Sequence, residues 1–430
     1  MAVENLTPFR TALDTMKEKS PQPDSQPTKT RAMLSALRHR NYRLYWLGHF
    51  SSVLAQNMEM VAQSWLVLQL TNSPLLLGLT GLTNSIPTIA LTLVGGVIAD
   101  RADRRGIVLF AQAITSAFFF ILATLVVSGR VRLWHILLFT FFSGCLRAFE
   151  RPSRLALLPQ TISKEEMASA VALAGTIWQL NRLIGPAVAG MLIYLLDVGP
   201  TYYGCFLASV AALICWYLIR IQGNDSQGRQ SGLLQHMMDG LRFIRSNEMF
   251  YTFIAMTFFN SVFGMSYSIL MPVFARDILL VGSQGYGFLQ SAGGAGALGG
   301  TLLVAAAARW KRKGLQAISG AVLFGMLLIG FGFSPWFPLS LVFVFLIGLS
   351  SQFYMTTIST ILQLKLPDQL RGRVMGIFGL TWDLMPVGGA VAGTMAEYTG
   401  APVAVAFGGF CVTAMALWVA VKLPRVRDLE

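Results

Sequence analysis

The sequence predicts an all-α integral membrane protein whose twelve transmembrane helices form two pseudo-symmetric bundles of six. The chain of 430 residues is 54% hydrophobic and only 12% charged, with a mean hydropathy of +0.58. A typical soluble protein carries about twice that share of charged residues. Apolar runs long enough to cross a bilayer recur along the chain, and one long polar connection divides them into two equal sets.

Each predicted span holds about 20 mainly apolar residues, the length that a helix needs to cross the hydrocarbon core. Because most connections are short, neighbouring helices must be antiparallel. The equal division into two sets of six indicates homologous halves. The predicted spans are 44–69, 75–99, 107–128, 133–150, 169–195, 201–220, 250–275, 285–308, 315–334, 337–362, 372–396 and 401–421.

The polar segments complete the predicted organisation. The first residues form a polar arm without the apolar core of a signal peptide. The central linker contains LLQHMMDGLRFI, an amphipathic stretch suited to a membrane surface. The five predicted regions are the arm at 1–40, the first bundle at 41–220, the linker at 221–249, the second bundle at 250–422 and the tail at 423–430.

The distribution of lysine and arginine predicts the orientation. With the N-terminus inside, 28 of the 33 basic residues lie on the cytoplasmic side and three lie outside, while Arg147 and Arg182 lie within spans. We therefore expect both termini in the cytoplasm and the protein in the inner or plasma membrane of the cell. The net charge of +13 then reflects topology, so no nucleic-acid partner is expected.

A dense run of charge follows the second predicted span, where residues 95–106 read GGVIADRADRRG. The Asp100 carboxylate can form charge-assisted hydrogen bonds with Arg101, Arg104 or Arg105 and thereby bridge helix ends. A bridge that forms in only one conformation would act as a latch between two moving halves. The alternative is simple anchoring of the helix ends by positive charge.

The segment from Gly96 to Arg105 resembles the signature loop of the major facilitator superfamily. WLVLQLTNSP (65–74), RPSRLALLP (151–159) and LPDQLRGRVMG (366–376) resemble its drug- and siderophore-exporting branch. NRLIGPAVAG (181–190) is similar to the fifth-helix signature of antiporters in this superfamily. The resemblance implies the major facilitator fold and transport by alternating access, and we expect a monomer.

Further residues are candidates for the latch and for contact between the halves. The fifth span contains Gly185, Pro186 and Gly190. This pattern predicts either a bend where the halves meet or ordinary helix packing. GAGALG at 294–299 matches a nucleotide-binding pattern but lies within a span, where small residues favour close helix packing. The remaining latch candidates after spans four and ten are Glu150, Arg151, Arg154, Arg371 and Arg373.

Four charged residues fall inside predicted spans: Glu59, Arg147, Arg182 and Asp383. Each costs about 2.5–3.5 kcal/mol at the centre of a helix and is expected to have a function. Glu59 is the first candidate for proton coupling; the alternatives are a fixed ion pair with Arg182 or Arg147, or recognition of a cationic substrate. Asp383 is the second candidate. Arg182 is expected to act structurally or electrostatically.

The resemblance also implies that spans one, four, seven and ten line a central cavity. Aromatic faces with scattered amides suit a bulky amphipathic ligand, although any single aromatic can face lipid instead. The cavity candidates on these spans are Gln56, Asn57, Gln63, Trp65, Phe141, Phe142, Asn260, Tyr267, Ser268, Gln352, Phe353 and Tyr354.

The predicted function is export of a small amphipathic molecule, drug or siderophore-like, driven by inward proton flow. An importer or facilitator of the same fold is the main alternative. An integral membrane enzyme would need clustered histidine, aspartate or cysteine, whereas the four histidines and four cysteines are isolated. A sensor would usually carry a large soluble domain. We therefore predict no enzymatic activity, no catalytic residue, no metal site and no cofactor.

Overall fold

The computed structural model describes residues 35–101, 103–163, 165–220, 233–307, 311–427 and 429. Side chains at 93, 94, 97, 99–101 and 233–237 lie outside this description. Most of the predicted arm and the first part of the predicted linker therefore lie outside the described residues, as do the side chains of Asp100 and Arg101.

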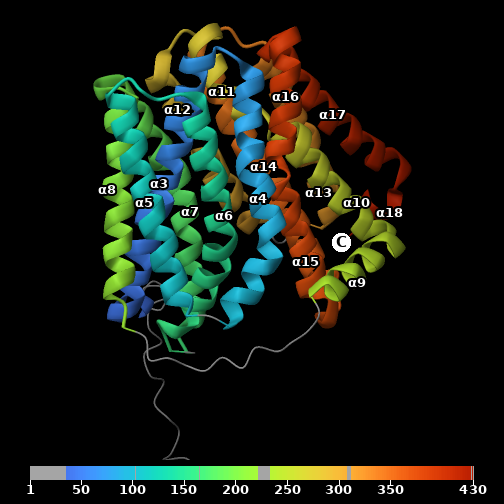
Figure 1. Ribbon diagram of the computed structural model, residues 1–430. Helices are drawn as coiled ribbons and strands as arrows, with labels where there is room; N and C mark the ends of the chain where they lie inside the picture. The colour runs from blue at the N-terminus through green and yellow to red at the C-terminus, as the bar shows by residue number, and fades with distance from the viewer. Residues whose placement is uncertain are drawn as a thin grey trace, which may run out of the picture.

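Long helices occupy every predicted span (Figure 1). The first six spans are α3 (Arg40–Thr71), α4 (Pro74–Arg101), α5 (Arg104–Val127), α6 (Leu133–Leu157), α7 (Met167–Leu196) and α8 (Val198–Leu218). The amphipathic part of the linker forms α9 (Leu233–Ser246). We call the end of the bundle where α9 lies the linker end and the opposite end the distal end.

The second half contains two spans that are built from several segments. The seventh span combines α10 (Glu248–Phe259), η3 (Asn260–Gly264), α11 (Tyr267–Val273) and η4 (Phe274–Ile278), and the eleventh combines α15 (Asp368–Asp383) and α16 (Met385–Thr399). The remaining helices are α12 (Gly282–Ala306), α13 (Lys313–Gly332), α14 (Phe337–Lys365), α17 (Ala401–Lys422) and the short α18 (Pro424–Arg427). The short 3-10 helices η1 (Ser35–Arg38) and η2 (Leu158–Gln160) lie at the linker end of the first half.

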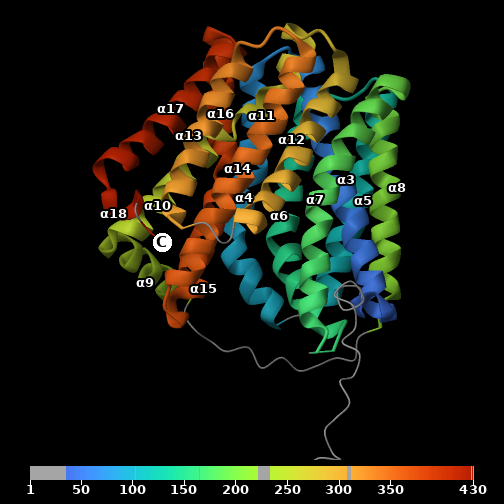
Figure 2. The same cartoon turned by 180° about the vertical axis from the view of Figure 1, so that it is seen from behind.

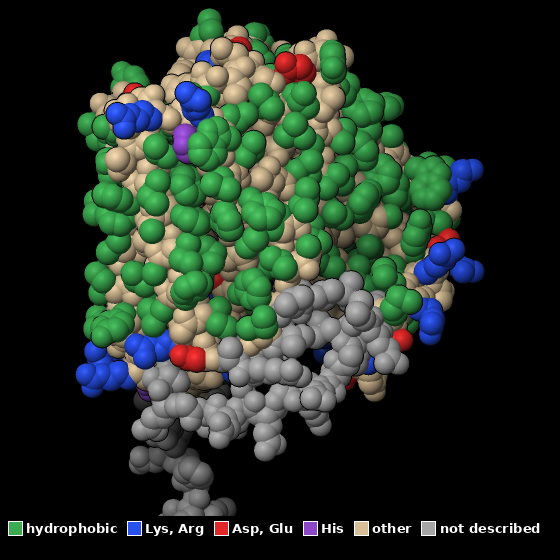
Figure 3. Space-filling model, viewed as in Figure 1, with side chains coloured by type: hydrophobic (Ala, Val, Ile, Leu, Met, Phe, Trp, Pro, Cys, Tyr) green, Lys and Arg blue, Asp and Glu red, His purple; other side chains and the backbone are tan. Residues whose placement is uncertain are grey.

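Ten helical segments within the described residues are long and apolar enough to cross a membrane. α3 and α6, with 32 and 25 residues, are also long enough but carry more polar and charged residues. They run beside the other helices (Figures 1 and 2) and complete the predicted twelve. Hydrophobic side chains cover the side of the bundle, and charged ones gather mostly towards its ends (Figure 3). The chain is a multi-pass membrane protein.

The sequence predicted unbroken helices where the structure has two interrupted spans. Pro386 has no N–H for the carbonyl of Trp382, which instead accepts from the Leu384 N–H at the junction of α15 and α16. In the seventh span, η3 and η4 are π-helical turns on either side of α11, which contains Pro272. Such turns are frequent at functional sites.

The same helix pairs pack in both halves. α4 packs on α6 as α12 packs on α14, α5 packs on α8 as α13 packs on α17, and α5 contacts α6 as α13 contacts α14. This correspondence between helices of equal rank is the arrangement expected of two homologous bundles. The predicted pseudo-symmetric architecture is therefore confirmed.

The two halves pack most extensively along two helix pairs, α7 with α12 and α4 with α16, and α11 also contacts α3 and α4. Glycines allow this contact: a Cβ at Gly287 would lie 2.5 Å from the Pro186 carbonyl oxygen, and a Cβ at Gly78 would lie 2.4 Å from that of Gly389. The predicted role of GAGALG in helix packing is confirmed, because Gly294 packs equally closely on the carbonyl of Arg182. Towards the linker end, α4 and α15 diverge (Figures 1 and 2).

Candidate functional site

A cluster of polar and aromatic side chains lies where the two halves face each other. The Trp65 ring on α3 stacks on the Tyr286 ring on α12, with centroids 6.2 Å apart and an interplanar angle of 18°. The Ser64 side chain also interacts with the Tyr286 hydroxyl. Gln290, one turn along α12, donates to Tyr286 (3.4 Å) and accepts from the Ser268 hydroxyl (3.4 Å). We call Trp65, Arg182, Tyr267, Ser268, Tyr286 and Gln290 the central cluster.

Pro272 helps to position the Ser268 side of this cluster. Because proline has no N–H, the Ser268 carbonyl lacks its usual partner one turn later in the helix. The Gln290 amide instead donates to that carbonyl at 3.5 Å. The break in the seventh span therefore exposes a backbone acceptor to α12 at the site.

Arg182 contributes the positive charge of the central cluster. It lies halfway along α7, and its guanidinium interacts electrostatically with Tyr267 of the other half. In the described part of the chain, no carboxylate oxygen lies within 4.0 Å of it. A half-buried guanidinium that no acid neutralises can bind an acceptor oxygen of a ligand.

Of the predicted cavity residues, Trp65, Tyr267 and Ser268 join the central cluster. Asn57 is buried against α7, since a Cβ at Gly185 would lie only 2.6 Å from the Asn57 Cβ. The Asn57 amide donates to the Val53 carbonyl one turn earlier in α3. Gln63 donates to Thr140 of α6 at 2.8 Å. These two amides connect helices within the first half.

The other cavity candidates serve mainly the packing of single helices or bundles. Asn260 and Tyr354 are fully buried in the second half, where the Tyr354 ring packs 5.9 Å from that of Phe324. Phe353 is buried too, whereas Phe141 and Phe142 are exposed. Gln56 and Gln352 donate to Ser52 and Thr356 of their own helices.

Sequence reasoning missed Tyr286 and Gln290 because span eight was not expected to line the cavity. A signal was nevertheless present. The two residues are four positions apart and so share one face of a glycine-rich helix. Polar side chains on the face that carries the small residues of a membrane helix indicate contact with another bundle.

Glu59 lies inside the first half rather than in the central cluster. Its half-buried carboxyl interacts electrostatically with Arg147 of α6 and lies near Tyr202 and Cys205 of α8. Within the described residues, neither Glu59 nor Arg147 has an ionic partner within 4.0 Å. The surroundings of Glu59 therefore do not include the close ion pair that was one interpretation of the sequence.

Asp383 reaches across the halves towards a latch candidate. Its carboxylate lies 3.8 Å from the Arg151 guanidinium of α6, at the end of α15 where the eleventh span breaks. The Arg151 side chain is 67% exposed, so solvent weakens this contact. The pair joins the halves on the linker side of the central cluster.

Other described latch candidates bind within their own half or to the linker helix α9. Arg105 donates to the carbonyls of Trp216 and Tyr217 at the end of α8. The remaining pairs are Arg154 with Glu150 at 2.6 Å, Arg371 with Asp368 at 2.8 Å and Arg373 with Asp239 of α9 at 2.8 Å. Gly96 has open space around its Cα. Arg104 begins α5, next to the N-cap Asp103.

Two charged side chains hold the halves together at the distal end. The Arg276 guanidinium of η4 donates to the Leu68 carbonyl (2.9 Å) and the Asn72 side chain (2.8 Å), and Asp277 orients it. The Glu397 carboxylate of α16 accepts from the Ser73 hydroxyl (2.8 Å) and the Leu75 N–H (3.2 Å). We call these contacts the distal clasp.

The distal clasp matches the polarity of the helix ends that it binds. The cation contacts the Leu68 carbonyl in the last turn of α3, which also accepts from the Asn72 N–H, and the anion contacts the Leu75 N–H in the first turn of α4. The protein is therefore closed across the halves at its distal end, while α4 and α15 diverge towards the linker end.

We predict that Arg276→Gln loosens the distal end, because glutamine carries no charge to bind the end of α3. Spin labels on cysteines at Ser128 and Trp336, one in each half, should show a larger population with a longer separation. Arg130→Gln is the matched control, since it removes one positive charge from the same end at a residue whose backbone is hydrogen-bonded within the first half. Equal distance distributions in both variants would contradict a clasping role.

Comparisons with known proteins agree with this architecture. The family model described as a transmembrane secretion effector matches residues 31–430. Macrolide efflux protein A of Streptococcus pyogenes is 22% identical over 376 residues, which cover 84% of this chain and 92% of that protein. Enterobactin exporter EntS of Shigella boydii is 27% identical over 405 residues, which cover 92% and 95%.

The fold also occurs in solved structures of transporters. The nucleoside transporter NupG superposes with a TM-score of 0.67 at 13% identity, covering 91% of this chain and 100% of that chain. At this identity the likeness concerns the fold, and it confirms the predicted major facilitator architecture.

Proposed function

The chain belongs to the transmembrane secretion effector family of the major facilitator superfamily, and from this premise we propose that it exports a small amphipathic molecule by proton antiport. Membership places it among transporters rather than enzymes. The observation that carries the proposal is the central cluster, in which the Arg182 guanidinium of the first half interacts with Tyr267 of the second half and has no carboxylate oxygen within 4.0 Å among the described residues. A site shared by two bundles is exposed to alternate sides as they rock.

The proposed substrate combines apolar rings with acceptor oxygens. Trp65 and Tyr286 are buried against each other in this conformation and would present aromatic faces to a ligand when the halves separate, while Arg182 offers donors suited to a carboxylate, phenolate or carbonyl. The relatives named above are a macrolide efflux protein and an enterobactin exporter. We therefore propose a drug or siderophore-like compound with such oxygens as the cargo.

We predict that Arg182→Gln raises the KM for export of an acceptor-rich substrate about ten- to a hundredfold, because a hydrogen bond to a charged group contributes about 1.5–3 kcal/mol. Arg182→Lys keeps the charge and should recover part of the loss. Export from cells should be measured for a panel of macrolides and catecholate siderophores. Variants with normal abundance and an unchanged KM for every transported compound would exclude Arg182 as a substrate ligand.

We propose that the linker end faces the cytoplasm and that both termini lie there. The support is the excess of basic residues in the segments assigned to that end. A cysteine at Leu280 should then react with an impermeant maleimide added to intact cells, whereas one at Gln369 should react only after the cells are opened. Both positions are exposed. The reverse pattern would invert the orientation and with it the direction of transport.

We propose Glu59 as the group that couples export to protons. A carboxyl group in a low-dielectric interior takes up a proton more readily than in water. Among the described residues, Glu59 has no ion-pair partner within 4.0 Å. It can therefore bind and release a proton without leaving a buried cation unpaired. Asp383, which faces the exposed Arg151, is the second candidate.

We predict that Glu59→Gln abolishes uphill export in inverted vesicles but keeps downhill exchange, since glutamine retains the shape and cannot titrate. Asp383→Asn is the matched control, and it should retain uphill export. Breaking a close buried ion pair would instead cost about 3–5 kcal/mol of stability, so melting temperatures separate the two interpretations. A stable Glu59→Gln protein that still concentrates substrate would transfer the coupling role to Asp383 or to another group.

A further inference from the structure

A large groove lies away from the central cluster, where α9 lies beside α10 and α15. It has a volume of about 1010 Å³, at the upper end of the roughly 300–1,000 Å³ found for small-molecule sites. Its wall is formed by apolar side chains of all three helices, among them Leu241, Ile254, Phe258 and Ile377. The polar side chains at the groove are those of Arg245, Thr381 and Tyr251.

Specific contacts hold the groove together. Asp239 of α9 accepts a hydrogen bond from Arg373 of α15 at 2.8 Å. Next to it, Gly240 lets the helices approach, since a Cβ there would lie 3.0 Å from the Ile377 side chain. Ile244 is buried between the helices, whereas Leu241 and Tyr251 remain 48% and 59% exposed. The groove is therefore a fixed feature with an open apolar wall.

Arg245 supplies a positive charge at the groove. It occupies the last turn of α9 and is exposed. The nearby acids do not neutralise it: Asp239 is paired with Arg373, and across the described ranges no carboxylate oxygen, that of Glu248 included, lies within 4.0 Å of Arg245. A guanidinium that none of these acids neutralises thus borders an apolar groove beside the amphipathic helix of a membrane protein.

We propose that this groove binds an anionic phospholipid of the adjoining leaflet, with an acyl chain along its apolar wall and the phosphate against Arg245. Basic pockets between membrane helices near the cytoplasmic surface suit such head groups. The groove is complementary to both ends of a phospholipid, because its apolar wall suits the acyl chain and Arg245 suits the phosphate. A polar solute fits less well, since the wall offers it few donors and acceptors. The long arginine side chain at the end of α9, just before the seventh span, also reaches the level of the phosphates readily.

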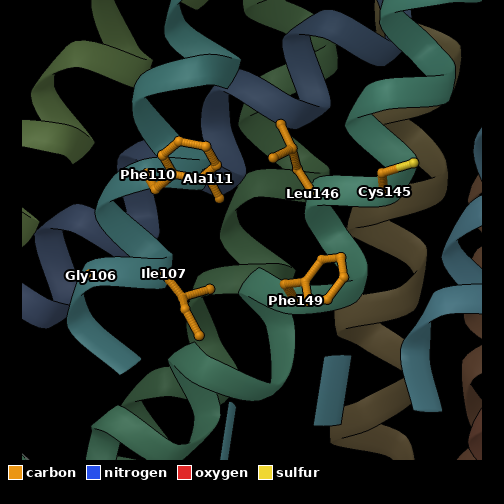
Figure 4. A pocket seen from close by; sticks show the side chains of 7 residues that line it. All are labelled: Gly106, Ile107, Phe110, Ala111, Cys145, Leu146 and Phe149. Atoms are coloured by element: carbon orange, nitrogen blue, oxygen red, sulfur yellow. The ribbon is translucent and has the colours of Figure 1, made fainter. Parts of the chain in front are cut away.

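A second groove, whose lining has no charged side chain, is a comparison for the effect of Arg245 on lipid selectivity. It lies between α5 and α6, has a volume of about 370 Å³ and is lined by Gly106, Ile107, Phe110, Ala111, Cys145, Leu146 and Phe149 (Figure 4). These residues offer an acyl chain a surface but offer its head group no charge. Lipid at α5 and α6 is therefore expected to be unselective, whereas the α9 groove selects anionic lipid.

Bound lipid would also affect the conformation of the second half. It would contact α9, α10 and α15 together, and α15 is the segment that diverges from α4 at the linker end. A ligand that binds one arrangement of these helices stabilises that arrangement. The lipid composition of the leaflet would thereby bias the position of α15.

The test is a titration of the full-length protein in detergent with dioleoyl phosphatidylglycerol or dioleoyl phosphatidylcholine, followed by native mass spectrometry. The wild type should bind one phosphatidylglycerol in preference to phosphatidylcholine. Arg245→Gln should weaken phosphatidylglycerol binding about fivefold and leave phosphatidylcholine unchanged. Arg242→Gln removes the same charge one turn earlier, outside the groove lining, and should keep the wild-type preference.

Ala255→Trp tests the position of the acyl chain, because a large side chain there fills the groove and should lower binding of both lipids. Equal weakening by the two arginine variants would mean that general surface charge attracts the lipid, and this would overturn the proposal. Unchanged binding to a folded Ala255→Trp protein would overturn it as well. If that variant does not fold, the comparison of Arg245→Gln with Arg242→Gln still decides, since both side chains are exposed.

Discussion

Everything in this protein depends on the close contact of two helix bundles along glycine-lined helices. A membrane offers no hydrophobic driving force between helices, so association must come from tight packing and polar contacts. Gly287 against Pro186 and Gly78 against Gly389 bring backbones together at distances that any Cβ would prevent. These contacts lie between the bundles and not within them. The halves can therefore tilt about this surface while the packing inside each bundle is kept.

The polar contacts across the halves have unequal strength at the two ends. At the distal end, Arg276 and Glu397 each make two hydrogen bonds to the ends of helices in the first half. Towards the linker end, the contact of Arg151 with Asp383 at 3.8 Å is longer and more exposed. A balance of this kind favours opening at the linker end in the described conformation, because the weaker contact gives way first.

The sequence predicted the spans and the paired architecture because hydropathy and span length are constrained by the bilayer itself. It did not predict the break between α15 and α16, since Pro386 lies in a run apolar enough to span without interruption. The candidate site was predicted only in part. Trp65 and Tyr267 were anticipated from their spans, whereas Tyr286 and Gln290 depend on how the bundles meet.

The charged latch was the least predictable feature. Side chains at helix ends find partners within a few ångströms, and sequence alone does not say which. Arg105 caps the end of α8, and Arg373 fixes α9, so both stabilise one bundle or its linker. Only the tertiary arrangement brings Arg151 to Asp383, which were predicted for different roles.

The proposed coupling group and the proposed substrate ligand lie on helices that pack against each other, α3 and α7. Glu59 and Trp65 are six residues apart on α3, about 9 Å along the helix axis. α3 is held to α7 at Asn57, which packs against Gly185, and Arg182 lies one turn from that glycine. A change of charge at Glu59 would, in the proposed mechanism, act on this packed pair of helices, which carries both Trp65 and Arg182. In the proposed mechanism, coupling needs no direct contact between proton and substrate, because the first bundle presents both sites as one body to the second.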